Sequence, residues 1–256
     1  MFAKPSRSAL PGCSIEDLPD IVLENWGFCS ICMGAAHFVA RHPWLRDYYL
    51  CQRCGTIPRQ RALVEVLNIV RPSWRDLAMH ESSPNIWFFS EQCTAYSASF
   101  FHPDTPLGAM RDGFRNEDLE RLTFPADSFD IFVTQDVLEH VFHPERALKE
   151  IMRVLRPGGV HIFTTPKHKH LLKSFRRAKV SDGVVEHLHK PQYHDYAAGD
   201  NSSLVTWDYG ADFDDLVQAW SGYSTSNFIL RDRSRGIDGE YLDVFVTQKL
   251  SANRLT

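Results

Sequence analysis

The sequence of 256 residues has no long apolar run, no apolar leader and no strong excess of either charge. No stretch approaches the ~18 apolar residues that a membrane span needs, and the opening MFAKPSRSALPGCS lacks the apolar core of a secretory signal. With 28 basic and 32 acidic side chains the formal net charge is −4, so no overall basic field attracts nucleic acid. We therefore expect a soluble, cytoplasmic protein without a membrane partner, and nucleic acid is disfavoured as a partner.

Six cysteines could form disulfides, but four of them form two close pairs in a chain without export features, which favours metal. Cys29 and Cys32 form one C-x2-C pair, and Cys51 and Cys54 form a second pair 18 residues later. This spacing is typical of zinc sites in which two tight turns complete a tetrahedral four-thiolate shell. Because that shell has no open position, we expect a structural Zn²⁺ on which a small module depends for folding. Disulfide pairing and an iron site of the rubredoxin type are the alternatives.

Patterning divides the chain into a small metal module and a larger α/β domain. The predicted units are an N-terminal extension (1–24), a zinc ribbon (25–58), a connecting helix (59–71) and a larger domain (72–250) with an insertion at about 167–210. In the helix, RQRALVEVLNIV, apolar side chains follow one face and Pro72 ends the pattern. Its basic start, with Arg59 and Arg61, is interpreted as solvated, with a phosphate contact as the alternative.

The stretch from Phe124 to Pro166 has the order strand, loop, helix, strand of a parallel βαβ unit. Residues 129–134 are a short apolar, β-rich run, and from Pro144 apolar side chains recur at three- and four-residue steps. Pro157-Gly158-Gly159 then ends the helix before a second apolar strand. Ligands of an open parallel sheet bind beyond the carboxyl ends of its strands. The side chains expected there are Gln135, Asp136, Glu139 and His140.

The motif TQDVLEHV, followed by a helix and RVLRPGGVHIFTTP, resembles the fourth and fifth strand region of class I S-adenosylmethionine-dependent methyltransferases, particularly the small-molecule type. The resemblance covers about residues 72–249. It implies an α/β fold with a Rossmann-like methyltransferase sheet, mostly parallel with an antiparallel last strand, here preceded by the zinc ribbon. It also implies an enzyme that uses S-adenosylmethionine. A βαβ unit from another doubly wound fold is the alternative.

The resemblance also implies where the cofactor lies. The segment DLAMHESSP occupies the place of the first strand and its glycine-rich turn, but serines stand where that family has glycines. The second strand, AYSASFF, lacks the usual acid for the ribose hydroxyls, which leaves serines for that role. Asp118 matches the acid near the adenine amino group, with a helix-capping role as the alternative. The expected cofactor-binding residues are His80, Glu81, Ser82, Ser83, Ser99, Asp118, Leu119, Gln135 and Asp136.

Methyl transfer from a sulfonium is an in-line displacement, so the enzyme aligns the acceptor and removes a proton from a hydroxyl. Asp136 and His140 follow the central strand and are the first catalytic candidates, because histidine titrates in the useful range. In the insertion, His194 with Asp195 is a second candidate for the general base. The alternative is that Glu139 and His140 only hold the loop and the cofactor.

Three further segments carry expectations. Lys167–Lys179 is basic and is interpreted as a solvated helix face, with a nucleic-acid contact as the alternative. Residues 212–220 predict the last helix, and 228–231 with 241–248 predict paired strands. A second metal at His187 and His189 is an alternative, although the spacing of these two histidines fits no standard metal site.

The sequence thus predicts methyl transfer from S-adenosylmethionine to a small-molecule acceptor such as a sugar or a biosynthetic intermediate. An RNA methyltransferase and a non-catalytic binding or assembly protein are the alternatives.

Overall fold

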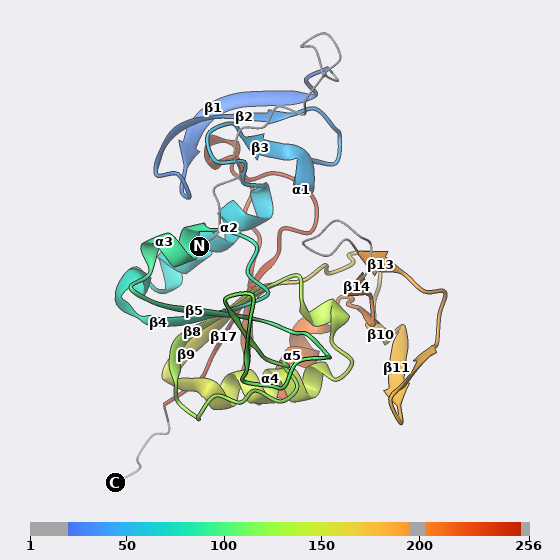
Figure 1. Ribbon diagram of the computed structural model, residues 1–256. Coiled ribbons are helices and arrows are strands. Elements are labelled where there is room, and N and C mark those ends of the chain that lie inside the picture. The colour runs from blue at the N-terminus through green and yellow to red at the C-terminus, as the bar shows by residue number, and fades with distance from the viewer. Residues whose placement is uncertain (1–19, 195–202, 252–256) are drawn as a thin grey trace.

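The computed structural model describes residues 20–194 and 203–251. In these ranges a large central sheet has helices on both faces, and a small three-stranded sheet lies above it (Figure 1). Of the helices described, none combines the length and the apolar character that crossing a bilayer requires.

The central sheet is mostly parallel. Its strands are β4 (Ala78–Ser82), β5 (Ala95–Phe100), β6 (Met110–Arg111), β7 (Phe114–Asn116), β8 (Phe129–Gln135), β9 (Leu155–Thr164), β16 (Thr225–Phe228) and β17 (Val244–Gln248). They lie in the order β16-β17-β9-β8-β4-β5-β7-β6. Strands β4, β5, β7, β8 and β9 run parallel, whereas β17, β16 and β6 are antiparallel to their neighbours. The predicted α/β, Rossmann-like class with an antiparallel end is confirmed.

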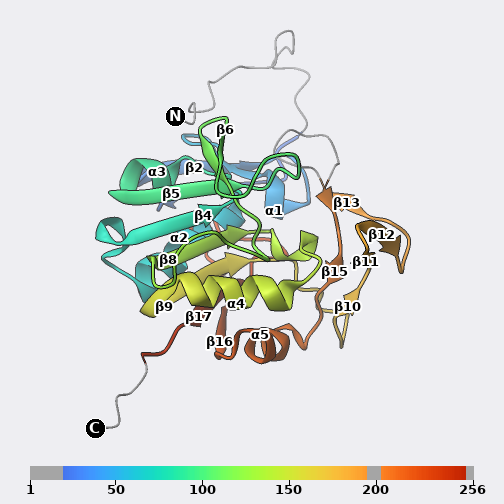
Figure 2. The ribbon, with the colours of Figure 1, turned by 60° about the horizontal axis from the view of Figure 1, so that its bottom comes forward.

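Helices cover the two faces of this sheet. One face carries α2 (Pro58–Val70) and α3 (Phe88–Gln92), and the other carries α4 (Pro144–Val154) and α5 (Phe213–Ser221) (Figures 1 and 2). Successive side chains of a strand point to opposite faces, so Ile131 and Val133 of β8 pack toward α2 and α3 while Phe132 packs toward α4 and α5. Short 3-10 helices are η2 (Trp74–Asp76), η3 (Leu138–His140) and η4 (Arg233–Arg235).

The small sheet and the turns around it form the cysteine module, residues 23–57. It contains β1 (Leu23–Cys29), β2 (Gly34–Ala40), α1 (Leu45–Tyr48) and β3 (Tyr49–Cys51), and its strands are antiparallel. Phe38 and Tyr49 belong to the same buried cluster as α2 and the strands of the central sheet. The module and the central sheet therefore share one apolar core on this side.

Arg61 of α2 fastens the module to a distant part of the chain. Its guanidinium is fully buried and donates hydrogen bonds to the carbonyl oxygens of Thr56, Tyr49 and Gly236. The start of α2 was expected to be solvated. That expectation is wrong for Arg59 and Arg61, because both pack between the module and the central sheet.

The insertion between β9 and α5 is a set of short strands. They are β10 (Phe175–Arg176), β11 (Ala178–Ser181), β12 (Val184–His187), β13 (Tyr193–His194), β14 (Ser203–Leu204) and β15 (Trp207–Asp208). They pair as β10-β15, β11-β12 and β13-β14 and lie at one end of the sheet (Figure 1). Thr206 anchors the returning chain, because its N–H and hydroxyl donate to the carbonyl of Glu139 at 2.7 and 3.0 Å.

Two expectations need correction. Lys167–Lys179 contains no helix; its turns and short strands are held by Asp212, which accepts from the N–H and hydroxyl of Ser174, and by Ala211, whose N–H donates to the carbonyl of Leu171. The predicted last strand pair forms, but its strands are β16 and β17, so the first of them ends at Phe228 and does not start there. Residues 229–243 leave the sheet, and within them the carbonyl of Arg233 accepts from the side chain of Asn25 in the cysteine module.

Candidate functional site

A cavity of about 1250 Å³ opens at the carboxyl ends of the parallel strands. Its lining comes from the ends of β4, β5, β7, β8 and β9, from α1 and α2 on one side and from the insertion on the other. The chain leaves β4 for β5 on one side, while β8 pairs with β4 on the other side, so the sheet reverses its direction of growth there. Such a reversal leaves a crevice at the strand ends, which is where open α/β sheets bind ligands.

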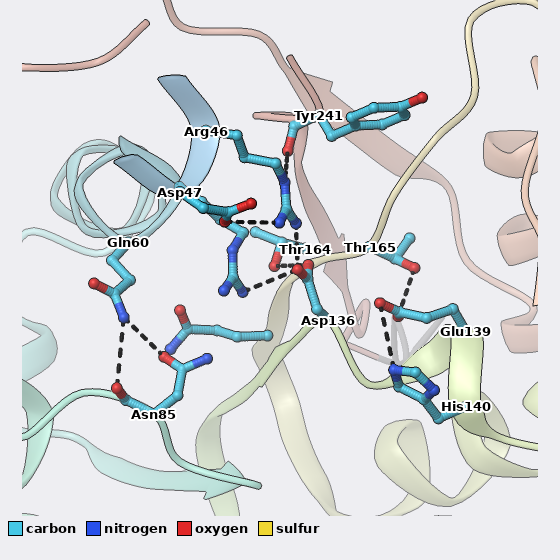
Figure 3. Close-up of polar contacts among 12 residues, drawn as sticks. Arg46, Asp47, Gln60, Asn85, Asp136, Glu139, His140, Thr164, Thr165 and Tyr241 are labelled. Carbon is cyan, nitrogen blue, oxygen red and sulfur yellow. Dashed lines mark hydrogen bonds and ion pairs between the residues drawn. The ribbon is translucent and has the colours of Figure 1, made fainter. Parts of the chain in front are cut away.

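The turn after β4 carries the serines that replace glycines. Ser82 and Ser83 line the cavity, and Ser83 adopts a left-handed backbone with φ of 53°. Its N–H donates to the carbonyl of Ser99 at 2.8 Å, which closes the turn. Gln60 of α2 supports the next residues, since its amide donates to the Asn85 side chain at 3.2 Å (Figure 3). A serine thus takes the conformation that a glycine adopts freely, at a cost of about 1 kcal/mol.

Three of the expected cofactor residues lie behind the cavity wall. His80 is fully buried, with its ring nitrogens 2.8 Å from the Ser97 hydroxyl and 2.9 Å from the Ser99 hydroxyl. Glu81 accepts hydrogen bonds from Tyr96 at 2.8 Å and Gln135 at 2.9 Å, and burial raises its pKa to about 7. His80, Glu81 and Ser99 do not line the cavity, and their side chains bond to neighbouring strands of the sheet, so their direct contact with a cofactor stays a prediction.

The other six expected residues line the cavity: Ser82, Ser83, Asp118, Leu119, Gln135 and Asp136. Asp118 accepts a hydrogen bond from the backbone N–H of Glu120 at 2.9 Å, which fixes the loop after β7. Phe100 and Phe101, at the end of β5, also line this part of the cavity. Sequence reasoning passed over these two aromatic side chains because it searched the strand end for a carboxylate.

Asp136 is the centre of a charged network. Its Oδ2 forms ion pairs with Arg46 of α1 and, at 3.2 Å, with Nη1 of Arg59, while its Oδ1 accepts from the hydroxyl of Thr164 at 2.9 Å (Figure 3). Burial by itself raises the pKa of Asp136, but Arg46 and Arg59 together hold it below its ordinary value. Asp136 is therefore a fixed carboxylate that joins the cysteine module to β8, an arrangement that does not suit a proton acceptor.

Arg59 has unused hydrogen-bonding capacity. It lines the cavity with only 8% of its surface exposed. Within the described part of the chain, its Nε has no hydrogen-bond partner, and Nη1 has only the ion-pair contact with Asp136. A buried guanidinium with free donors is costly, so this side chain is suited to an anionic group in the cavity.

The opposite end of the cavity contains Glu139, His140 and His194. Glu139 is 2% exposed, and its Oε2 accepts from the hydroxyl of Thr165 at 2.9 Å. Its Oε1 has no hydrogen-bond partner among the described residues and has only the longer contact with Nε2 of His140, at 3.9 Å (Figure 3). The ring of His194 lies perpendicular to that of His140, with 5.2 Å between centroids. The structure thus brings together the two histidines that the sequence predicted. Asp195 lies outside the described residues.

Comparison with known proteins supports the Rossmann-like, methyltransferase-type fold. Residues 98–163 match a family model described as a methyltransferase domain. The matched segment runs from β5 to β9 and includes the loops that carry Asp118, Asp136 and His140.

Curated relatives are similar to part of this chain. The ubiquinone biosynthesis O-methyltransferase of Coxiella burnetii is 33% identical over 93 residues, which are 36% of this chain and 39% of that protein. The ubiquinone/menaquinone biosynthesis C-methyltransferase of Pseudomonas savastanoi pv. phaseolicola is 38% identical over 65 residues, which are 24% of this chain and 25% of that protein. The chain therefore spans about two fifths or less of these relatives.

Among solved structures, an amino pentose methyltransferase from Micromonospora echinaspora with bound S-adenosylmethionine is similar. It has 13% sequence identity and a TM-score of 0.47 and covers 76% of this chain and 92% of its own.

The four paired cysteines form a separate cluster outside the matched segment. The sulfurs of Cys29 and Cys54 are 3.8 Å apart, as are those of Cys32 and Cys51, and all four lie within 4.8 Å of one another. In a tetrahedral shell with Zn–S bonds of about 2.3 Å, sulfurs are about 3.8 Å apart. A disulfide needs about 2.05 Å, so these thiols are not paired with each other. The cluster has the donor type and the size that Zn²⁺ requires.

The described residues contain one further group suited to a metal ion, which is Glu139, His140 and His194. His187 and His189 belong to neither group, and His189 instead packs against the ring of Phe175. The alternative of a second metal at those two histidines is therefore not supported in the described part of the chain.

Proposed function

We propose that this protein transfers a methyl group from S-adenosylmethionine to a small-molecule acceptor. The observation that carries the proposal is the cavity at the carboxyl ends of β4 and β8, because six residues expected to bind the cofactor line it. The match of residues 98–163 to a methyltransferase domain supports it. The curated relatives have names of O- and C-methyltransferases of quinone biosynthesis, which supports a biosynthetic intermediate as the acceptor.

The lining suits the two ends of the cofactor. Phe100 and Phe101 offer apolar surface for a flat adenine ring, and Asp118 in the adjacent loop would accept from its amino group. Arg59 would meet the methionine carboxylate with the donors that lack partners, and Ser82 and Ser83 would let the backbone approach. Bound S-adenosylmethionine supplies a methyl group on a positively charged sulfur.

We assign acceptor activation to the end of the cavity formed by Glu139, His140 and His194. Both histidines line the cavity, and loops of this kind carry the specificity of many enzymes, which supports a role of the described part of the insertion in acceptor binding. Asp136 would position this loop through its arginine pairs instead of taking a proton.

We also propose that Cys29, Cys32, Cys51 and Cys54 hold one structural Zn²⁺. The left-handed Gly55, with φ of 71°, donates its N–H to the carbonyl of Cys51 at 2.8 Å and so shapes the second turn. Because the four thiolates fill a tetrahedral shell, the ion would have no open position for chemistry.

Calorimetry with S-adenosylmethionine and with S-adenosylhomocysteine tests the proposed cofactor. We expect one site per chain with micromolar affinity for both. Transfer of a labelled methyl group to a panel of phenols, hydroxy acids and sugars then tests the acceptor class. Absence of detectable heat at millimolar cofactor would overturn the enzymatic proposal and favour a binding or assembly role.

A further inference from the structure

Glu139, His140 and His194 offer three metal-ligand atoms that lie within 4.8 Å of one another. They come from two separate segments, η3 and β13, and all three residues line the cavity. This group is distinct from the four cysteines, and nothing in the proposed zinc site depends on it.

The hydrogen bonds around the group fix which atoms face its centre. Nδ1 of His140 lies 2.9 Å from the carbonyl oxygen of Leu204. A carbonyl oxygen only accepts, so Nδ1 is the nitrogen that donates to it, and Nε2 is the nitrogen left to face the group. Oε2 of Glu139 is occupied by the Thr165 hydroxyl, which leaves Oε1 as the open ligand atom.

Nε2 of His140 and Oε1 of Glu139 are 3.9 Å apart, which is too long for a hydrogen bond. Leaving a buried carboxylate oxygen without a partner is costly, and a cation between the two atoms would remove that cost. Outer hydrogen bonds that orient a histidine and a carboxylate in this way are typical of metal sites.

We propose that Glu139, His140 and His194 bind a divalent cation at the acceptor end of the cavity. This inference rests on the proposed methyl transfer and names how the same site activates its acceptor. Two imidazoles and one carboxylate suit a first-row transition ion such as Mn²⁺, Co²⁺ or Zn²⁺ better than Ca²⁺ or Mg²⁺, which prefer oxygen ligands. Three protein ligands leave positions open on the ion.

The open positions define the substrate class. An acceptor hydroxyl that binds the ion has a lowered pKa and loses its proton to water. The oxygen then forms a bond to the methyl carbon, and the electron pair of the broken carbon–sulfur bond stays on sulfur, which gives a methyl ether and S-adenosylhomocysteine. An acceptor with a second oxygen beside the hydroxyl, such as a catechol or an α-hydroxy acid, fills two positions. The two histidines then act as ligands, and solvent takes the proton.

The test is a titration of the intact, zinc-loaded chain with Mn²⁺, followed by the loss of the free-ion electron paramagnetic resonance signal. Mn²⁺ is chosen because it competes poorly for four thiolates. We expect one bound Mn²⁺ per wild-type chain, and at least tenfold weaker binding for Glu139→Gln and His194→Ala. His187→Ala is the matched control, since this exposed histidine lies outside the group, and it should bind as the wild type does.

Glu139→Gln keeps the side-chain shape and can keep the Thr165 contact, so circular dichroism should show an unchanged fold. The proposal is overturned if wild-type protein leaves all Mn²⁺ free, or if Glu139→Gln binds it as tightly as wild type. Calorimetry with S-adenosylmethionine on the same samples distinguishes failure of the metal-site proposal from failure of the proposed methyl transfer. Cofactor binding without Mn²⁺ binding removes the metal site alone, whereas loss of both removes the proposed function as well.

Discussion

Nη1 of Arg59 lies 3.2 Å from Oδ2 of Asp136, so the helix that follows the cysteine module touches the loop that follows the central strand β8. Arg46 of α1 binds the same carboxylate from the module itself. One acidic side chain therefore holds two parts of the chain together at the edge of the cavity. Breaking a buried charge pair by removing one partner leaves the other uncompensated, which makes this contact a sensitive point.

Arg59→Gln should weaken binding of S-adenosylmethionine by about 10- to 100-fold, because the methionine carboxylate loses a charge-assisted partner. Calorimetry measures this change, and thermal unfolding of the cofactor-free variant separates it from a loss of fold. Arg111→Gln, at an exposed arginine outside the cavity, is the control. If Arg59→Gln binds S-adenosylmethionine as tightly as wild type does, then Arg59 does not bind the methionine carboxylate of the cofactor.

Removal of zinc should destabilise the whole chain and not the cysteine module alone, because both share one buried cluster. Elemental analysis should find one zinc per chain in wild-type protein and none in Cys51→Ser. Cys93→Ala should retain the metal, since Cys93 is buried beside η2 and away from the cluster. A single cooperative unfolding transition that moves to lower temperature on chelation is the expected result. Two independent transitions would contradict the shared core.

The free energy of unfolding should fall with rising pH, because Glu81 has a raised pKa in the folded protein. Burial raises the pKa of Glu81 to about 7 from an ordinary value of 4.5, so between these pH values the unfolded chain has released a proton that the folded chain retains. The free energy of unfolding therefore decreases as pH rises across this window, by on the order of 3 kcal/mol from this group.

Denaturant titrations of wild type and Glu81→Gln at pH 5 and pH 8 isolate this contribution. The difference between the two proteins should change with pH, because the substituted amide does not titrate, whereas the other titratable groups are the same in both proteins. The same pH dependence in both proteins would show that Glu81 does not retain its proton in the folded state.

His140→Ala and His194→Ala should each lower kcat by at least about 100-fold while leaving the affinity for S-adenosylmethionine near that of wild type. The reason is that both rings line the acceptor end of the cavity and not the end assigned to the cofactor. The measurement is methyl transfer to whichever acceptor wild-type protein uses. His170→Ala, an exposed histidine outside the cavity, is the control. Full activity in both variants would refute the assignment of this end.

Ser83→Gly should raise the free energy of unfolding by up to about 1 kcal/mol, because Ser83 adopts a left-handed backbone that glycine adopts without strain. Ser82→Gly is the matched comparison. Ser82 lies within β4, where glycine is unfavourable, so this variant should be less stable than wild type. Denaturant titration measures the free energy of unfolding of both variants. A destabilised Ser83→Gly would be inconsistent with the left-handed backbone described for Ser83.

Local patterns were sufficient to predict the parts of the chain in which neighbouring residues determine the structure. The apolar run of residues 129–134 and the three- and four-residue spacing after Pro144 predicted β8 and α4, because both patterns depend on residues close in sequence. The helix was expected to end at Pro157-Gly158-Gly159, but α4 ends at Val154 and those residues already belong to β9. The two cysteine pairs likewise predicted their own clustering, since each pair lies on one tight turn.

Contacts between distant segments could not be predicted in this way. Arg46 was not identified, and Arg59 was placed in solvent, because their surroundings depend on how the cysteine module packs against the sheet. The helix expected over Lys167–Lys179 does not form, because Asp212, far along the chain, binds Ser174. His80 and Glu81 were assigned to the cofactor from their position alone, and sequence patterns did not predict their bonds to β5 and β8.

The three carbonyl groups bound by Arg61 set a limit on how this protein can be dissected. Two of them, those of Thr56 and Tyr49, precede α2 in the chain, and the third belongs to Gly236. A fragment starting at residue 58 would expose to water the side chains of α2 that pack against the cysteine module. It would also leave the guanidinium of Arg61 without two of its three carbonyl partners. Expression of the larger domain by itself should therefore give insoluble material, and studies of its chemistry will need the intact polypeptide.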